Sequence, residues 1–150
     1  MCGIVGLFLK DKSLEPKLGA MLSDMLVTMT DRGPDSAGIA IYGSEVNKNG
    51  KITIQSDAPD EVFSDLEQDI KTATGTKVSV KRKSTHAVLE MDASEVNSVR
   101  VALNKIRPSV RIMSAGDTIE IYKEVGLPKD VAARFDISTM SGTHGIGHTR

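Results

Sequence analysis

The chain has 150 residues, which is long enough for one domain with a hydrophobic core. Hydrophobic residues make up 39% of it and charged residues 26%, as in ordinary soluble globular proteins. A net charge of −1 argues against a nucleic-acid-binding surface, which needs a clustered excess of basic residues. No apolar run approaches the ~18 residues that span a bilayer, and the single cysteine suits a reducing compartment. We therefore expect a cytoplasmic protein with no nucleic-acid or membrane partner.

The first part of the chain predicts a strand followed by a helix. Residues 3–9 are almost continuously apolar, which is typical of a buried strand. From Leu14 to about Thr30, apolar residues recur every three or four positions, which indicates one face of a helix. Ser13 is a plausible N-cap for that helix. The helix must end near Pro34, because proline lacks a donor and restricts the residue before it.

A hairpin is predicted over residues 38–55. Its strands would be residues 38–42 and 51–55. Between them lies Asn47-Lys48-Asn49-Gly50, and Asn-Gly is a strong signal for a tight turn.

The middle of the chain predicts an alternation of strands and helices. From residue 51 the order is strand, helix, strand, strand, helix, strand, which is also the order of the split βαβ arrangement in ferredoxin-like folds. The predicted elements cover residues 51–55, 60–72, 77–81, 87–91, 92–106 and 110–113. A strand at 118–122, a short helix at 128–135 and a glycine-rich segment at 141–147 follow.

Cys2 is the only cysteine and becomes the first residue once Met1 is removed. The mature chain would then carry a thiol and a free α-amino group, a nucleophile and a candidate base, on one residue. An adjacent base makes a thiol a competent nucleophile. The alternative is that Cys2 is a small apolar residue at the start of a buried strand.

Two further segments carry recognisable patterns. The first is Asp31-Arg32-Gly33-Pro34-Asp35-Ser36-Ala37-Gly38. Taken alone, it reads as a helix-terminating turn with a capping aspartate. The second is His148-Thr149-Arg150, which taken alone reads as the polar end of a strand.

Together with the Cys2-Gly3-Ile4 start, these segments resemble the class II glutamine amidotransferases, the cysteine branch of the N-terminal nucleophile hydrolases. The resemblance implies that Cys2 attacks the side-chain amide of glutamine, with its own α-amino group relaying the proton. It implies that Arg150 binds the substrate α-carboxylate, a role that suits a planar guanidinium. Arg32 and Gly33 resemble the turn that closes over the nucleophile, and the resemblance implies that they help to bind the substrate.

The resemblance covers roughly residues 2–42 and 145–150. It implies an α+β chain that forms the N-terminal part of a four-layer α/β/β/α N-terminal nucleophile hydrolase fold, with residues 51–140 as an inserted α+β module of ferredoxin-like order. The family places an oxyanion-binding Asn-Gly pair and a substrate-binding aspartate after the His-Thr-Arg segment. We therefore expect residues 1–150 to be a domain truncated at its C-terminal end and inactive alone, since losing one oxyanion donor already costs ~10²–10³ in rate. Asn49-Gly50 precedes that segment and is not assigned this role.

The partners implied by the resemblance are glutamine and an ammonia-accepting synthase. The sequence of residues 2–42 is most similar to the glutaminase subunits of glutamate-synthase-like enzymes, such as that of N-methylglutamate synthase. Pro34 is shared with asparagine synthetase, and a phosphoribosyl-pyrophosphate amidotransferase is a further alternative, as is a non-catalytic regulatory or scaffolding subunit. No cofactor or metal is expected, because the residues show neither a zinc-ligand pattern nor a phosphate-binding loop.

Overall fold

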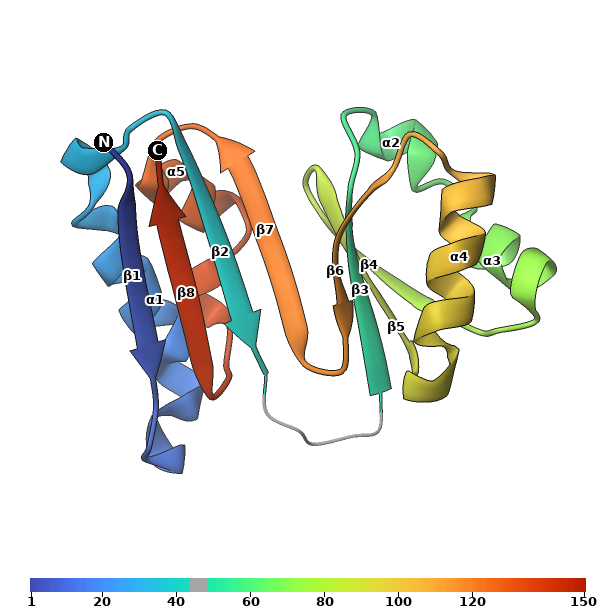
Figure 1. Ribbon diagram of the computed structural model, residues 1–150, viewed down its shortest axis with the longest axis horizontal. Coiled ribbons are helices and arrows are strands. Elements are labelled where there is room, and N and C mark those ends of the chain that lie inside the picture. The colour runs from blue at the N-terminus through green and yellow to red at the C-terminus, as the bar shows by residue number, and fades with distance from the viewer. Residues whose placement is uncertain (44–48) are drawn as a thin grey trace. The chain divides into compact units, whose positions relative to one another are not determined.

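The computed structural model describes residues 1–43 and 49–150. Contacts divide the chain into two compact units, Met1–Ser44 with Ile121–Arg150, and Glu45–Glu120. The described residues of each unit form a four-stranded sheet with helices packed against it (Figure 1). The chain is thus a mixture of helices and antiparallel strands, as the sequence predicts.

The sheet of the first unit has the strand order β1-β8-β2-β7. These strands are β1 (Gly3–Phe8), β8 (His144–Thr149), β2 (Ser36–Tyr42) and β7 (Ile119–Val125). The middle strand β8 runs antiparallel to both β1 and β2. Residues 144–149 of β8 therefore lie between β1 and β2, two strands from the first 42 residues of the chain.

The predicted helix over residues 14–30 is divided in three. A 3₁₀ helix, η1 (Lys12–Lys17), precedes α1 (Leu18–Val27), and a second 3₁₀ turn, η2 (Thr30–Arg32), follows. Pro16 lies inside η1, and a proline cannot donate the backbone hydrogen bond that an α-helix interior needs. The cap is Asp11 rather than Ser13, because the Asp11 carboxylate accepts from the backbone N–H of Ser13. Hydrogen bonds from the Ser13 side chain and from its backbone N–H lower the pKa of Asp11.

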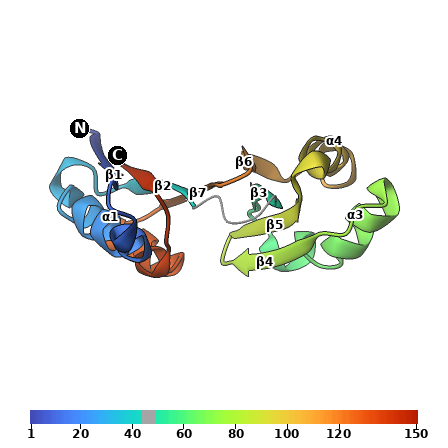
Figure 2. The same ribbon diagram turned by 90° about the horizontal axis from the view of Figure 1, so that it is seen from below.

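Helix α1 covers one face of the first sheet (Figure 2). Its leucines Leu18, Leu22 and Leu26 are fully buried. Two glycines of β8 allow the close approach, since a Cβ on Gly145 would lie 2.7 Å from Leu22 Cδ2 and one on Gly147 would lie 2.8 Å from Leu26 Cδ1. The end of the glycine-rich segment 141–147 thus lies in β8, one of the two inner strands of the sheet. α5 (Pro128–Arg134) and η4 (Ile137–Thr139) pack beside α1.

The predicted hairpin over residues 38–55 is wrong. Strand β2 pairs within the first sheet, whereas β3 (Asn49–Gln55) pairs with strands of the second unit. Asn49 and Gly50 open β3 instead of forming a turn, and Asn47 and Lys48 lie outside the described residues. Gly50 is needed for packing, because a Cβ there would meet Val96 Cγ2 at 2.0 Å.

The second unit has the predicted order of strands and helices. Its sheet, β4-β5-β3-β6, is antiparallel throughout. After β3 come α2 (Pro59–Val62), α3 (Leu66–Thr74), β4 (Ser79–Lys83), β5 (His86–Asp92), η3 (Ala93–Glu95), α4 (Val96–Ile106) and β6 (Arg111–Gly116). The helix predicted at 60–72 is split because Asp65 has left-handed backbone, with φ 52°.

A separate hydrophobic core fills the second unit. Its buried members come from β3, β5, α3, α4 and the segments between them; they include Ile52, Ile54, Phe63, Leu66, Ile70, Leu89, Val99 and Leu103. This unit ends at Glu120, whereas the predicted module extends to residue 140, because β7 joins the first sheet and α5 packs on α1. That the second unit is an insertion into another fold stays a prediction. None of the described helices has the length and apolar character needed to cross a membrane.

Candidate functional site

Cys2 and Arg150 lie at the same end of the first sheet. Gly3 is the Cα partner of Thr149 in the antiparallel pair β1–β8. In such a pair, the residue before Gly3 and the residue after Thr149 extend beyond the pair in the same direction. Cys2 is a free, exposed cysteine at this end, and Figure 1 shows both chain termini there.

The Arg32–Gly38 segment contacts the same end of β8. Gly33 is buried, and a Cβ on it would lie 2.4 Å from the backbone nitrogen of Arg150 and 2.6 Å from the carbonyl carbon of Thr149. Only a residue without a side chain allows these two backbone segments to approach so closely. Arg32, the neighbour of Gly33, is exposed to solvent.

Three backbone hydrogen bonds hold Arg150 in place. The N–H groups of Asp35 and Ser36 donate to the Arg150 carbonyl at 2.7 and 3.0 Å, and the Arg150 N–H donates to the Ser36 carbonyl at 2.9 Å. The Asp35 carbonyl in turn accepts from Gly126 at 2.9 Å. The structure thus brings together the three sequence segments that carry the family resemblance.

Thr149 is a residue of this region to which the sequence patterns assign no role of its own. It is fully buried, and its Oγ1 donates to the Met29 carbonyl at 3.3 Å. The alternation of Gly145, Gly147 and Thr149 along one strand could have indicated from the sequence that Thr149 is buried, because these three residues share the inward face of the strand. Because Gly145 and Gly147 pack against α1, the next inward residue, Thr149, lies near the end of that helix.

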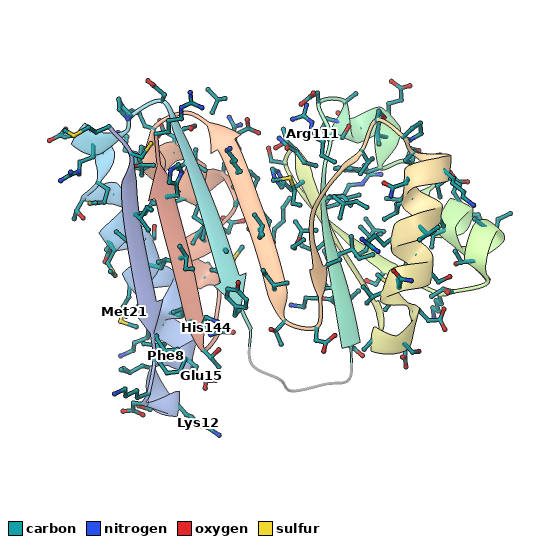
Figure 3. The ribbon with its side chains drawn as sticks, viewed as in Figure 1. Phe8, Lys12, Glu15, Met21, Arg111 and His144 are labelled. Carbon is teal, nitrogen blue, oxygen red and sulfur yellow. The ribbon has the colours of Figure 1, made fainter. Side chains whose placement is uncertain are left out.

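His144 and Asn49-Gly50 do not belong to this end of the sheet. His144 is at the opposite end of β8, stacked on Tyr42 with ring centroids 4.1 Å apart and beside Phe8 at 5.7 Å (Figure 3). Asn49-Gly50 belongs to the second unit. Among the described residues, no group of three or more histidine, cysteine, aspartate or glutamate side chains is placed to hold a metal ion.

The face of the first sheet that α1 does not cover carries large apolar side chains. Ile4, Phe8 and Ile146 are 70%, 68% and 47% exposed. Ile4, Phe8 and His144 alternate with residues that point toward α1, so their side chains share this face. An apolar sheet face of this kind is typical of a surface that another layer covers.

The geometry offers an exposed thiol beside two segments that each bear an arginine. The Cys2 thiol can act as a nucleophile, and a guanidinium can bind a carboxylate with two parallel hydrogen bonds. A site with these groups fits a small substrate that carries both an electrophilic carbonyl and a carboxylate.

Comparison with known proteins finds two relatives along the whole chain. The chain is 64% identical over 150 residues to the glutamine amidotransferase-like protein GlxB of Rhizobium meliloti (strain 1021), and covers 50% of that protein. It is 33% identical over 171 residues to a putative glutamine amidotransferase of Methanothermobacter thermautotrophicus, and covers 52% of it. No family model matches the chain. The chain thus spans about half the length of the curated relatives it matches, and both are named for glutamine amidotransfer.

Proposed function

We propose that this chain carries the nucleophile of a class II glutamine amidotransferase and that Cys2, freed by removal of Met1, is that nucleophile. The observation that carries the proposal is the convergence of the three resembling segments: Gly3 pairs with Thr149, and Gly33 packs against Arg150. The names of the two relatives support the same class of reaction.

In the proposed reaction, the Cys2 sulfur attacks the side-chain carbonyl carbon of glutamine. The α-amino group of Cys2 accepts the thiol proton and donates it to the departing nitrogen, which leaves as ammonia. Water then attacks the γ-glutamyl thioester, which releases glutamate and restores the thiol. The Arg150 guanidinium binds the substrate α-carboxylate, and Arg32 with Gly33 closes over the nucleophile.

The proposed whole protein has a four-layer α/β/β/α fold, of which the first unit supplies one helical layer and one sheet. The exposed face with Ile4, Phe8 and Ile146 supports this proposal, because a second sheet would bury it. The relatives are about twice as long as the chain, which leaves room in them for a second sheet and helical layer.

In this proposal the second unit is a ferredoxin-like module inserted into the glutaminase domain. Its β-α-β-β-α-β order and its own hydrophobic core support an independently folded insertion. The ammonia would pass to a partner synthase, and a glutamate-synthase-like enzyme is the partner we propose.

The test is the intact mass of the full-length protein before and after treatment with a glutamine-analogue affinity label. We expect a mass without Met1 and one label per chain, located on Cys2. Cys2→Ala removes the covalent nucleophile, so labelling should disappear and glutamine hydrolysis should fall by roughly 10⁶-fold.

The matched control is ammonia itself. Cys2→Ala should leave ammonia-dependent synthesis by the complex unchanged, because ammonia bypasses the thiol. A full-length protein that keeps Met1 and takes up no label would contradict the proposal and favour a regulatory or scaffolding role.

A further inference from the structure

The hydroxyl of Thr149 contacts the turn that contains Arg32. The Met29 carbonyl accepts one hydrogen bond from the Thr149 hydroxyl, at 3.3 Å, and a second from the backbone N–H of Arg32, at 3.0 Å. Met29 is the residue from which the 3₁₀ turn Thr30–Arg32 starts. One carbonyl oxygen therefore links the Thr149 side chain to the backbone of Arg32.

The same side chain lies against the residue that follows Cys2. Thr149 is the Cα partner of Gly3 on one side and of Ala37 on the other. A Cβ on Gly3 would be only 2.8 Å from Thr149 Oγ1 and 3.1 Å from Met29 Cε. Thr149 thus contacts the start of β1 directly and the Arg32 turn through one hydrogen bond.

Burial of a hydroxyl at this position costs free energy, and packing within the strand does not by itself require a hydroxyl there. Valine has the same shape and suits a buried strand equally well, whereas a buried hydroxyl is unfavourable unless it finds a partner. The partner here is the carbonyl of Met29, which lies between the end of α1 and the turn Thr30–Arg32 and also accepts the Arg32 N–H. The Thr149 hydroxyl therefore ties the end of β8 to the turn that follows α1.

We propose that Thr149 is a positioning residue that holds the Arg32–Gly33 turn at a set distance from Cys2. The inference rests on the proposed role of Cys2 as the nucleophile that attacks glutamine. Thr149 itself touches no reacting atom. It acts by fixing the turn against which the substrate is held.

The test compares two labelling rates in the full-length protein. A glutamine-analogue label needs both the thiol and the substrate-holding turn, whereas iodoacetamide needs only the thiol. Thr149→Val should slow labelling by the glutamine analogue about 10–100-fold, the effect of a misplaced substrate, and leave the iodoacetamide rate within about twofold. Thr149→Ser keeps the hydroxyl and should restore the analogue rate to within about threefold of the natural protein.

Thr28→Val is the matched control. The Thr28 hydroxyl also donates to a backbone carbonyl, that of Met25 at 2.7 Å, but within the end of α1 and exposed to solvent. The Thr28→Val variant should leave both the glutamine-analogue rate and the iodoacetamide rate unchanged. If Thr149→Val does not fold, the labelling rates of Thr149→Ser and Thr149→Ala are compared instead. These two variants differ only in the hydroxyl, so the comparison isolates its effect.

Four outcomes would overturn the inference, and they are distinguishable. Labelling of Thr149→Val at the natural rate, or equal rates for the serine and alanine variants, contradicts the positioning role alone. An equal fall in both labelling rates shows an effect on the thiol rather than on the turn. If the natural protein takes up iodoacetamide but no glutamine analogue, the proposed function fails, and the inference fails with it.

Discussion

Gly33 shows how a single residue brings distant segments together. Its backbone lies against that of Thr149 and Arg150, more than a hundred positions away in the chain, because it has no side chain. The sequence identifies Gly33 through the pattern around it, but the reason for the glycine is visible only where the two backbones meet.

Gly33→Ala should therefore disturb both stability and substrate binding. The added Cβ would be 2.4 Å from a backbone nitrogen that cannot rotate away, so one segment must shift. We expect the free energy of unfolding to fall by about 1–3 kcal/mol, as in overpacked cores. Labelling of Cys2 by a glutamine analogue should slow at least about tenfold. Urea unfolding and labelling kinetics measure the two effects.

Gly38→Ala provides the control for stability within the same segment. Its Cβ would meet Lys123 atoms no closer than 3.6 Å, which is ordinary contact. The unfolding free energy should change by less than about 1 kcal/mol. Equal destabilisation by the two alanines would show that the close approach at Gly33 is not what constrains that position.

At the scale of elements, β8 explains why a glycine-rich segment can be a central strand. Glycine is ordinarily poor in strand interiors, because it loses more backbone entropy and packs no side chain. Here Gly145 and Gly147 face α1, and their missing side chains let Leu22 and Leu26 approach the strand. Burial of the two leucines offsets the weak strand propensity.

Gly147→Ala should destabilise the first unit, whereas Gly6→Ala should not. A Cβ on Gly147 would lie 2.8 Å from both Leu26 Cδ1 and Val5 Cγ2, so we expect a loss of about 1–3 kcal/mol. A Cβ on Gly6, in the neighbouring strand but on the exposed side, would have its nearest atom at 4.0 Å. Gly6→Ala should be neutral or stabilising by up to about 1 kcal/mol. Thermal unfolding of the two variants tests whether a glycine is needed at position 147 because α1 packs closely against it, rather than because it lies in a strand.

At the scale of the whole molecule, the chain contains two cores. The buried cluster of the second unit uses residues from Ile52 to Val110 only. The ion pair between Arg107 and Asp69 also lies within this unit. Its packing therefore does not depend on residues of the first unit for any of these contacts.

We expect residues 45–120 to fold when expressed alone. Their unfolding in urea should be cooperative, with a stability of a few kcal/mol, as in other small domains. Leu103→Ala, in the buried core, should cost about 2–5 kcal/mol and abolish most of that stability. Val101→Ala, on the same helix but 45% exposed, should have little effect. A gradual, non-cooperative transition in the isolated fragment would contradict the independence of this unit.

Much of the chain could be predicted from local pattern. A continuous apolar run identified β1, and apolar residues at a spacing of three and four identified α1 and α4, all to within a few residues, because burial of one helix face imposes a period of about 3.6. The order of strands and helices in the second unit followed from the same rule. The three segments at the candidate site were also visible in the sequence, because together they resemble one family, although two of them taken alone indicate only a turn and a strand end.

What only the tertiary structure decided is which segments meet. Asn49-Gly50 has the local chemistry of a turn, yet it opens a strand because Val96 requires a glycine opposite it. Strand β2 pairs with β8 rather than with its neighbour in the chain, and this pairing places Arg150 beside Gly33. Local pattern carries no record of a partner a hundred residues away, because pairing and close backbone approach depend on the shapes of both segments at once. By itself the sequence determined most of the elements and the candidate site residues, and the folded chain determined that Cys2, the Arg32 turn and Arg150 share one end of a sheet.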